Sequence, residues 1–148
     1  MSKFYSLNAI NKKNATYNVI FGERSNGKTY ATLKQGVIDY YKNGGQMAYV
    51  RRWKEDITGR RASRLFSALC ENGEIQKITN NEFTGVHYWA GKWYLCNYDD
   101  NGKAIYSDID IICFSFALSD GEHDKSTSFP KIQTIIFDEF LTNKIYLN

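Results

Sequence analysis

Apolar runs separated by polar and glycine-rich stretches predict most of the regular structure of this chain. Residues 17–21 form a short apolar run, and Tyr30, Leu33 and Val37 follow it at helical spacing. A glycine pair then ends the predicted helix, and residues 46–50 form a second apolar run. Strand, helix and strand at this spacing predict a right-handed, parallel βαβ unit.

The middle of the chain has a different pattern. Apolar residues recur at helical spacing over residues 62–69 and predict a short amphipathic helix. Across residues 73–118, short apolar runs alternate with turn signals and predict an antiparallel β-meander. We interpret this meander as an insertion before the next core strand, residues 132–137. The expected fold class is therefore α/β, with a parallel sheet flanked by helices.

Composition and length support one globular domain over residues 1–148. The chain is 43% apolar and contains a single proline. No apolar run approaches a membrane span, and the N-terminus lacks a signal-peptide core. The three cysteines have no C-x-x-C spacing, which argues against a zinc site or a disulfide framework and fits a reducing compartment. We expect a cytoplasmic setting, in a host cell if the protein is viral.

Residues 22–29 carry the strongest chemical signal, because they match the phosphate-binding pattern G-x-x-x-x-G-K-[ST] (Walker A). Its glycines let successive backbone N–H groups point at an anion, and a helix that begins there adds its positive end. A chance glycine turn is the alternative, which the strand before the loop and the helix after it disfavour. The predicted nucleotide-binding residues are Gly22, Glu23, Arg24, Ser25, Asn26, Gly27, Lys28, Thr29 and Tyr30.

A pair of acids completes the predicted site. Asp138 and Glu139 follow the apolar run 132–137, as a Walker B strand would require. Asp138 suits Mg²⁺ binding and Glu139 suits the base that activates water. A solvated strand end is the less favoured alternative.

Basic residues cluster after the second apolar run. For Arg51, Arg52 and Lys54, a role near the phosphates and a solvated basic loop are supported about equally, since open α/β sheets bind ligands at the carboxyl ends of their strands. The three arginines that follow lie largely on the polar side of the predicted helix over residues 62–69. The six residues are Arg51, Arg52, Lys54, Arg60, Arg61 and Arg64.

Other candidates in the sequence are weaker. Five aromatic residues of the meander could stack on bases, although half-buried packing is the favoured interpretation. The aspartates at positions 99, 100, 108 and 110 do not form an EF-hand loop, and His87 and His123 have no ligand spacing. The aromatic residues are Trp89, Trp93, Tyr94, Tyr98 and Tyr106.

Together, three blocks of the chain resemble the small-podovirus DNA-packaging ATPases, also called encapsidation proteins. They are residues 22–29, residues 49–54, and a third block in which Lys125-Ser126 runs on to Phe129-Pro130 and residues 135–140. The blocks span most of the chain from Asn18 to Phe140. The resemblance implies a P-loop NTPase of the additional-strand, catalytic-glutamate class, with ATP and Mg²⁺ as cofactors.

The resemblance also implies roles for individual residues. Lys28 binds phosphate, Thr29 and Asp138 hold Mg²⁺, and Glu139 activates water. Arg24 corresponds to a basic residue that contacts phosphate. Lys54 corresponds to a basic position that acts at the nucleotide of the neighbouring subunit, and Arg51 or Arg52 could assist it.

The function that the resemblance implies is an ATP-hydrolysing motor that translocates double-stranded DNA into a viral procapsid. The implied partners are a homo-oligomeric ring, by resemblance a pentamer, and the viral portal or connector, with a packaging RNA as a further candidate. The motor would act in the host cytoplasm at the procapsid vertex, without a membrane. Because the family continues well past the acidic strand, we expect a truncated ATPase domain without its C-terminal core strands, arginine finger and nuclease-like domain. Little turnover is expected from this chain alone.

Two alternatives stay open at this point. A small P-loop kinase would use Lys28, Thr29 and Asp138 in the same way, although the consecutive acids favour hydrolysis. A nucleotide-binding fragment without turnover would share the ancestry of the motor and differ only in activity.

Overall fold

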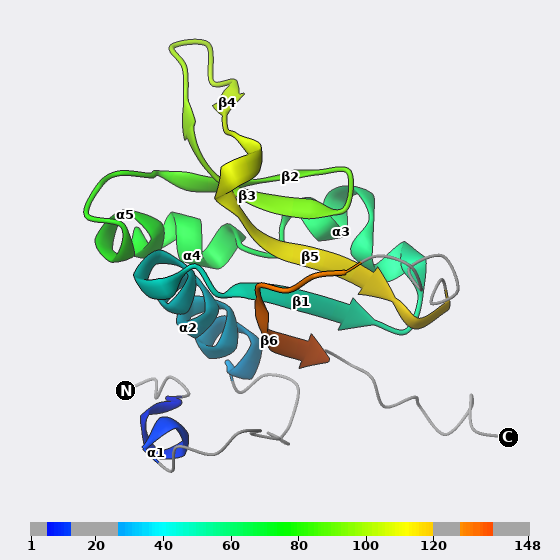
Figure 1. The fold of residues 1–148 in the computed structure, drawn as a ribbon. Coiled ribbons are helices and arrows are strands. Elements are labelled where there is room, and N and C mark those ends of the chain that lie inside the picture. The colour runs from blue at the N-terminus through cyan, green and yellow to red at the C-terminus, as the bar shows by residue number, and fades with distance from the viewer. Residues whose placement is uncertain (1–5, 13–26, 120–127, 138–148) are drawn as a thin grey trace, which may run out of the picture.

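The computed structural model describes residues 6–12, 27–119 and 128–137 (Figure 1). A six-stranded mixed sheet carries this part of the chain, in the order β2-β3-β5-β1-β6, with β4 beside β3. The strands are β1 (Gln46–Arg51), β2 (Gly85–Trp89), β3 (Lys92–Tyr98), β4 (Ala104–Ile105), β5 (Ile111–Ala117) and β6 (Ile132–Phe137). The helices are α1 (Asn8–Asn11), α2 (Lys28–Asn43), α3 (Gly59–Ser63), α4 (Ser67–Glu71) and α5 (Glu74–Ile78), with two 3-10 turns, η1 (Lys54–Ile57) and η2 (Asp108–Asp110).

Helix α2 is the predicted helix, and a glycine in the left-handed region stands at each end. Gly27 has φ 71° before it and Gly44 has φ 80° after it, a conformation that costs a glycine little. Leu33 and Val37 are buried one turn apart and pack towards the sheet. The apolar spacing and the glycine pair in the sequence were sufficient to predict this helix.

Strand β1 is the centre of the parallel part of the sheet. It pairs in parallel with β5 on one side and with β6 on the other, and Val50 lies between Phe116 and Phe137. Residues 47–50 are all buried, which explains why the sequence shows a continuous apolar run and not an alternating one. The expected first strand, residues 17–21, lies outside the described residues.

The expected meander is only partly right. Strands β2 and β3 form an antiparallel hairpin around Ala90-Gly91, as the turn signals predict. Strand β5, however, pairs antiparallel with β3 and parallel with β1, so it belongs to the main sheet. The apolar run of β5 suits a buried strand in either direction, and its sequence therefore does not reveal its partner.

The helical segment before the hairpin is longer than the sequence predicts. Three short helices, α3 to α5, replace the single helix expected over residues 62–69. Gly73 has φ 71° and turns the chain into α5, where Ile75 is fully buried. Helix α5 falls within residues 73–118, which the sequence pattern assigns to the meander, so the sequence did not predict it.

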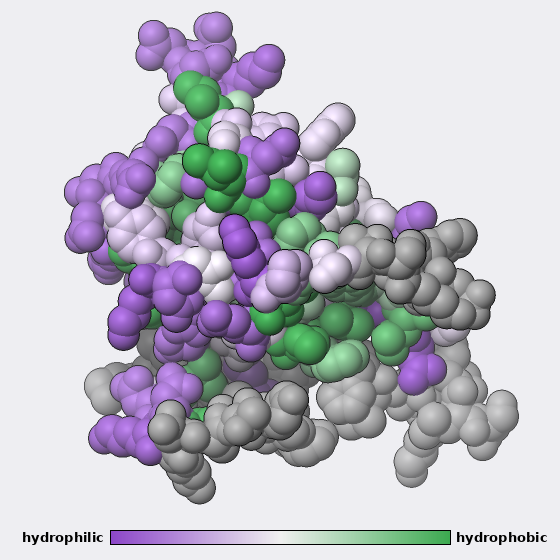
Figure 2. All heavy atoms as spheres, viewed as in Figure 1, coloured by the Kyte–Doolittle hydropathy of each residue, from purple (hydrophilic) through white to green (hydrophobic). Residues whose placement is uncertain are grey.

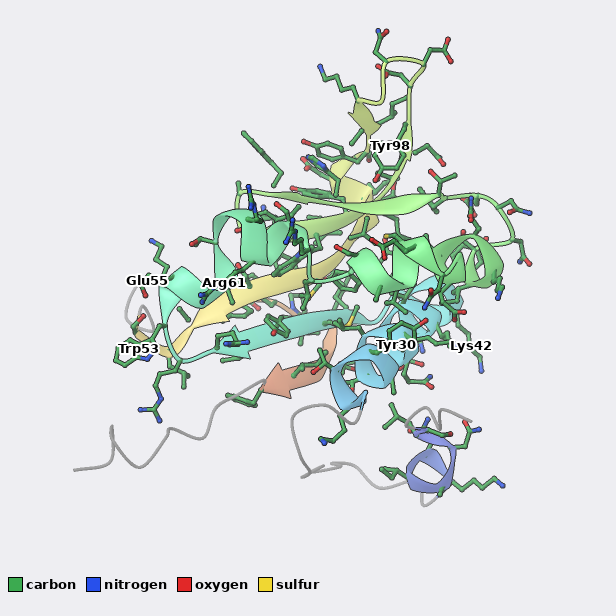
Figure 3. All side chains as sticks on the ribbon, turned by 180° about the vertical axis from the view of Figure 1, so that it is seen from behind. Tyr30, Lys42, Trp53, Glu55, Arg61 and Tyr98 are labelled. Atoms are coloured by element: carbon green, nitrogen blue, oxygen red, sulfur yellow. The ribbon has the colours of Figure 1, made fainter. Side chains whose placement is uncertain are left out.

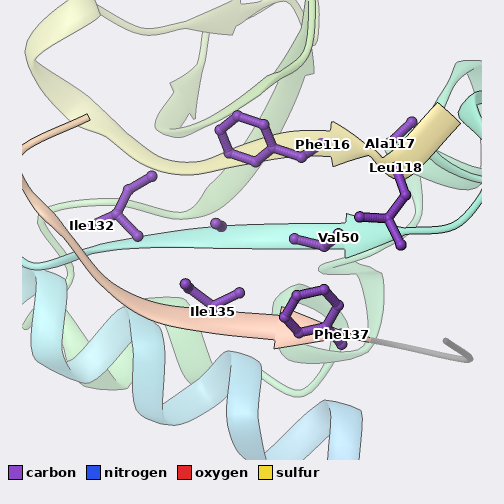
Figure 4. Close-up of a pocket in the computed structure, with 8 residues that line it drawn as sticks. Val50, Phe116, Ala117, Leu118, Ile132, Ile135 and Phe137 are labelled. Atoms are coloured by element: carbon purple, nitrogen blue, oxygen red, sulfur yellow. The ribbon is translucent and has the colours of Figure 1, made fainter. Parts of the chain in front are cut away.

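Helices α2 to α5 share one apolar core with one face of the sheet. Met47, Tyr49 and Ile136 join this core together with the large ring of Trp93. The alternate residues of the same strands face the other way. They line an apolar groove of about 370 Å³ on the opposite face (Figure 4), and apolar atoms gather over this part of the surface (Figure 2). The groove is lined by Ala48, Val50, Phe116, Ala117, Leu118, Ile132, Ile135 and Phe137.

Trp93 ties this core to the chain that follows β1. Its side chain is 1% exposed, and its indole Nε1–H donates a 2.8 Å hydrogen bond to the carbonyl oxygen of Ala62. Tyr49, Phe66 and Tyr88 all lie within ring-contact distance of it.

We predict that Trp93→Phe lowers the free energy of unfolding by about 2 kcal/mol, because it removes a buried hydrogen bond and leaves a void. Trp89→Phe is the matched control, since Trp89 lies on the same hairpin with 62% of its surface exposed. Denaturant unfolding of the two variants measures the difference. Equal stabilities would mean that the Trp93 contacts do not hold the core.

Candidate functional site

The parallel strands bring several predicted site residues to one edge of the sheet. β1, β5 and β6 run in the same direction, so their carboxyl ends lie together. Helix α2 runs against β1, and Figure 1 shows its first turn at the same side as the end of β6. The start of α2, the chain after Arg51 and the end of β6 therefore share the carboxyl edge, where open α/β sheets bind ligands.

Of the phosphate-binding pattern, the structure describes the last three residues, 27–29. Gly27 is the N-terminal cap of α2 and has no side chain that could accept from the first-turn N–H groups. Lys28 and Thr29 follow on the first turn and are both half-buried. Backbone N–H groups at a helix start, a lysine and a hydroxyl fit a polyphosphate with Mg²⁺. The remaining predicted residues, 22–26, 138 and 139, lie outside the described part of the chain.

Tyr30 lies one residue further along α2. Its hydroxyl accepts a 3.0 Å hydrogen bond from Nδ2 of Asn72, which connects α2 to the end of α4. The ring also packs against the core. These contacts give Tyr30 a structural role, and its predicted contact with nucleotide remains untested.

The basic segment begins where β1 ends. Arg51 is the last residue of β1, and its Nη1 donates a 3.4 Å hydrogen bond to the hydroxyl of Tyr49. Lys54 opens the turn η1 and is exposed. Figure 3 shows Trp53 and Arg61 at the end of the sheet to which β1 points. The structure thus places Lys54 on the same edge as the start of α2.

A polar cleft beside α2 was not predicted from the sequence. It has a volume of about 680 Å³ and lies between α1, α2 and α5. Nζ of Lys34 lies 2.8 Å from the carboxylate of Glu74, and the Glu74 side chain is only 12% exposed. Lys34 and Glu74 are forty positions apart in the chain, so no local pattern connects them.

The weaker candidates receive structural roles. Oδ1 of Asp99 accepts from the backbone N–H groups of Asn101 and Lys103 and so fixes a turn. Burial raises the pKa of the thiols of all three cysteines, which keeps them protonated and unreactive at neutral pH. Among the described residues, no group of three His, Cys, Asp or Glu side chains could hold a metal ion. No helix in the same part of the chain has the length and apolar composition that crossing a bilayer requires.

The aromatic residues of the hairpin region divide into two groups. Trp93 and Tyr94 are buried, as half-buried packing predicts, whereas Trp89, Tyr98 and Tyr106 are exposed. Tyr106 stacks between Tyr94 and His87, with ring centroids 4.7 and 4.8 Å away. Among these five residues, the rings of Tyr94 and Tyr106 contact each other, and Trp89 is the most exposed.

Comparison with known proteins gives the family. The model of the podovirus DNA encapsidation protein (Gp16) family matches residues 1–148. The chain belongs to this family. The DNA packaging protein of Bacillus phage phi29 is 27% identical over 143 residues, which are 97% of this chain and 36% of that protein. The DNA packaging protein of Bacillus phage B103 is 28% identical over 127 residues, which are 86% of this chain and 33% of that protein.

Solved structures show the same fold. The N-terminal domain of the DNA packaging ATPase from bacteriophage phi29 has a TM-score of 0.68 at 24% identity, covering 95% of this chain and 61% of that one. A chain of the phi29 genome packaging motor assembly has a TM-score of 0.63 at 22% identity, covering 97% of this chain and 37% of that one. The encapsidation chain spans about a third of the length of the packaging proteins that it matches.

These matches confirm the expected link to DNA packaging at the level of the family, and they correct the narrower classification. From its motifs we expected the chain to be an ATPase domain of the additional-strand, catalytic-glutamate P-loop NTPases. The matches support the encapsidation family and the N-terminal domain of a packaging ATPase, not a P-loop domain. The sheet is mixed: β1 and β6 pair in parallel as expected, and the antiparallel hairpin strands belong to the same sheet because β5 pairs with both β1 and β3.

We predict that Lys34→Met lowers the free energy of unfolding by about 1–2 kcal/mol, because Glu74 loses its close partner inside the cleft wall. Lys77→Met is the control: Lys77 lies 3.7 Å from the same carboxylate with 74% of its side chain exposed, so the expected cost is within about 0.5 kcal/mol. Thermal or denaturant unfolding compares the two. An equal effect of both substitutions would contradict the role of the Lys34–Glu74 pair.

Proposed function

We propose that this chain is the nucleotide-binding part of a motor that uses ATP to translocate double-stranded DNA into a viral procapsid. The observation that carries this proposal is the match of the whole chain to the encapsidation family, together with a phosphate-binding pattern whose described end lies at the carboxyl edge of the sheet. The kinase alternative has no comparable support, since all the relatives above are named for DNA packaging.

The proposed site assigns each residue a task. The N–H groups of residues 22–29 and the ammonium group of Lys28 hold the phosphates of ATP, and Arg24 contacts the same phosphates. Thr29 and Asp138 hold Mg²⁺, which neutralises the phosphate charge when it is bound. Glu139 positions and deprotonates the attacking water. Lys54, exposed at the carboxyl edge, reaches the nucleotide of a neighbouring subunit.

The motor requires an assembly around this site. We propose a homo-oligomeric ring, by resemblance a pentamer, that docks on the viral portal in the host cytoplasm. The similarity to chains of two phage packaging motors supports this proposal. The DNA is held through its phosphate backbone, because a packaging motor has to move every sequence equally well.

We predict that Lys28→Ala weakens binding of a non-hydrolysable ATP analogue with Mg²⁺ by about 100-fold or more, because a cation is removed from the phosphates. Lys42→Ala is the matched control, since it removes an exposed lysine from the last turn of the same helix. Titration calorimetry on the 148-residue chain measures both. The phosphate site is refuted if Lys28→Ala and Lys42→Ala bind the analogue equally well.

We predict that Glu139→Gln keeps analogue binding within about threefold and lowers turnover by about 100-fold or more, because an amide cannot take the proton of water. The measurement is DNA-stimulated phosphate release by the complete packaging protein. Glu82→Gln serves as the control, since this exposed carboxylate accepts from the hydroxyl of Tyr41, away from the carboxyl edge. Undiminished turnover in Glu139→Gln would remove Glu139 from the mechanism.

A further inference from the structure

Helix α3 is anchored to the sheet by contacts of the residues within and beside it. Ala62 is buried on its inner side, and its carbonyl oxygen accepts the indole N–H of Trp93. Just before the helix, buried Ile57 accepts a 3.3 Å hydrogen bond from the hydroxyl of Tyr88. Buried Phe66 follows the helix and packs on the same tryptophan. The backbone of residues 57–66 is thus anchored at three places to the rigid core.

The outer side of this anchored segment is basic. Arg60, Arg61 and Arg64 are all exposed, and the N–H of Arg64 bonds to the carbonyl oxygen of Arg60 over 3.1 Å. That bond closes one helical turn and puts Arg60 and Arg64 on the same side. Residues 57–70 contain three arginines and no aspartate or glutamate, while Glu55 and Asp56 precede this segment and Glu71 follows it. We call these three residues the arginine surface.

The apolar packing of this segment does not depend on arginine at these positions. The buried residues of the segment are apolar, and exposed helical positions accept any good helix former. Three guanidinium groups on a rigid support instead suit phosphate, which they bind through paired N–H donors at a small entropic cost. Trp53, 53% exposed, lies at the same end of the molecule as Arg61 (Figure 3), and the exposed Lys54 follows it in the chain.

We infer that the arginine surface contacts the phosphate backbone of double-stranded DNA. This inference rests on the proposed function, because a DNA-moving protein needs contacts that grip the backbone without reading sequence. Turn η1 joins β1 directly to α3. The DNA contact is therefore separated by one short turn from the strand that ends at the proposed nucleotide edge.

The test is the salt dependence of duplex DNA binding by the 148-residue chain. In the triple variant Arg60→Gln, Arg61→Gln, Arg64→Gln, the slope of log affinity against log salt concentration falls by roughly 2 to 3, since each lost phosphate contact removes about 0.9. The control variant Lys12→Gln, Lys42→Gln, Lys103→Gln removes the same charge from exposed positions on other elements. Its slope changes by less than about 1.

A second variant separates a phosphate contact from a folding effect. With Arg60→Lys, Arg61→Lys and Arg64→Lys together, the positive charges remain and the slope returns close to that of the parent chain. Equal slopes for the two glutamine variants would overturn the inference, and so would tighter binding to duplex RNA than to duplex DNA at every salt concentration. Absence of DNA binding by the parent chain would overturn it as well.

Nucleotide titration of the same proteins keeps the two proposals apart. If the proposed function fails, the parent chain does not bind the ATP analogue. If only the arginine surface is wrong, analogue binding by all variants stays intact while the salt slope of the triple glutamine variant matches that of the control.

Discussion

The parallel pairing of β1 with both neighbours is the constraint on which the rest of the structure depends. A parallel neighbour must point the same way, so the chain has to return across the sheet before each new strand begins. Helix α2 makes one of these return paths before β1, and the segment with α3 to α5, β2 and β3 makes another after it. The start of α2 and the carboxyl ends of β1 and β6 therefore lie at one edge of the sheet. Burial of β1 on both faces keeps this arrangement in register.

How far the sequence predicts this fold depends on whether a signal is local. Helix α2 and strands β1 and β6 follow from apolar spacing and from the glycines beside them, and the structure confirms all three. The direction of β5 depends on a partner some sixty positions away, and an apolar run carries no record of it. The ion pair between Lys34 and Glu74 in the cleft could not be predicted either, because its two residues also lie far apart in the sequence. Helix α5 was not predicted because it lies within residues 73–118, whose short apolar runs and turn signals indicate strands.

In the candidate site, too, some features follow from a local sequence signal and others depend on the fold. The spacing of residues 22–29 predicts phosphate binding from the sequence alone, because consecutive backbone N–H groups bind the anion together. Where Lys54 lies relative to α2 cannot be read from spacing, since it depends on how the sheet is ordered. The P-loop class assigned to the chain went wrong because short motifs alone do not identify a domain. The family match and the likeness to an N-terminal domain of a packaging ATPase decided that question.

The close approach of Gly36 to Met47 has a mechanical consequence. A Cβ at position 36 would overlap the buried Met47 side chain, so α2 lies directly on β1 without any intervening layer. Close-packed interiors transmit displacement and do not absorb it. Helix α2 and the sheet accordingly behave as one stiff body. A displacement of the first turn of α2 is therefore passed on to β1 and to the strands paired with it.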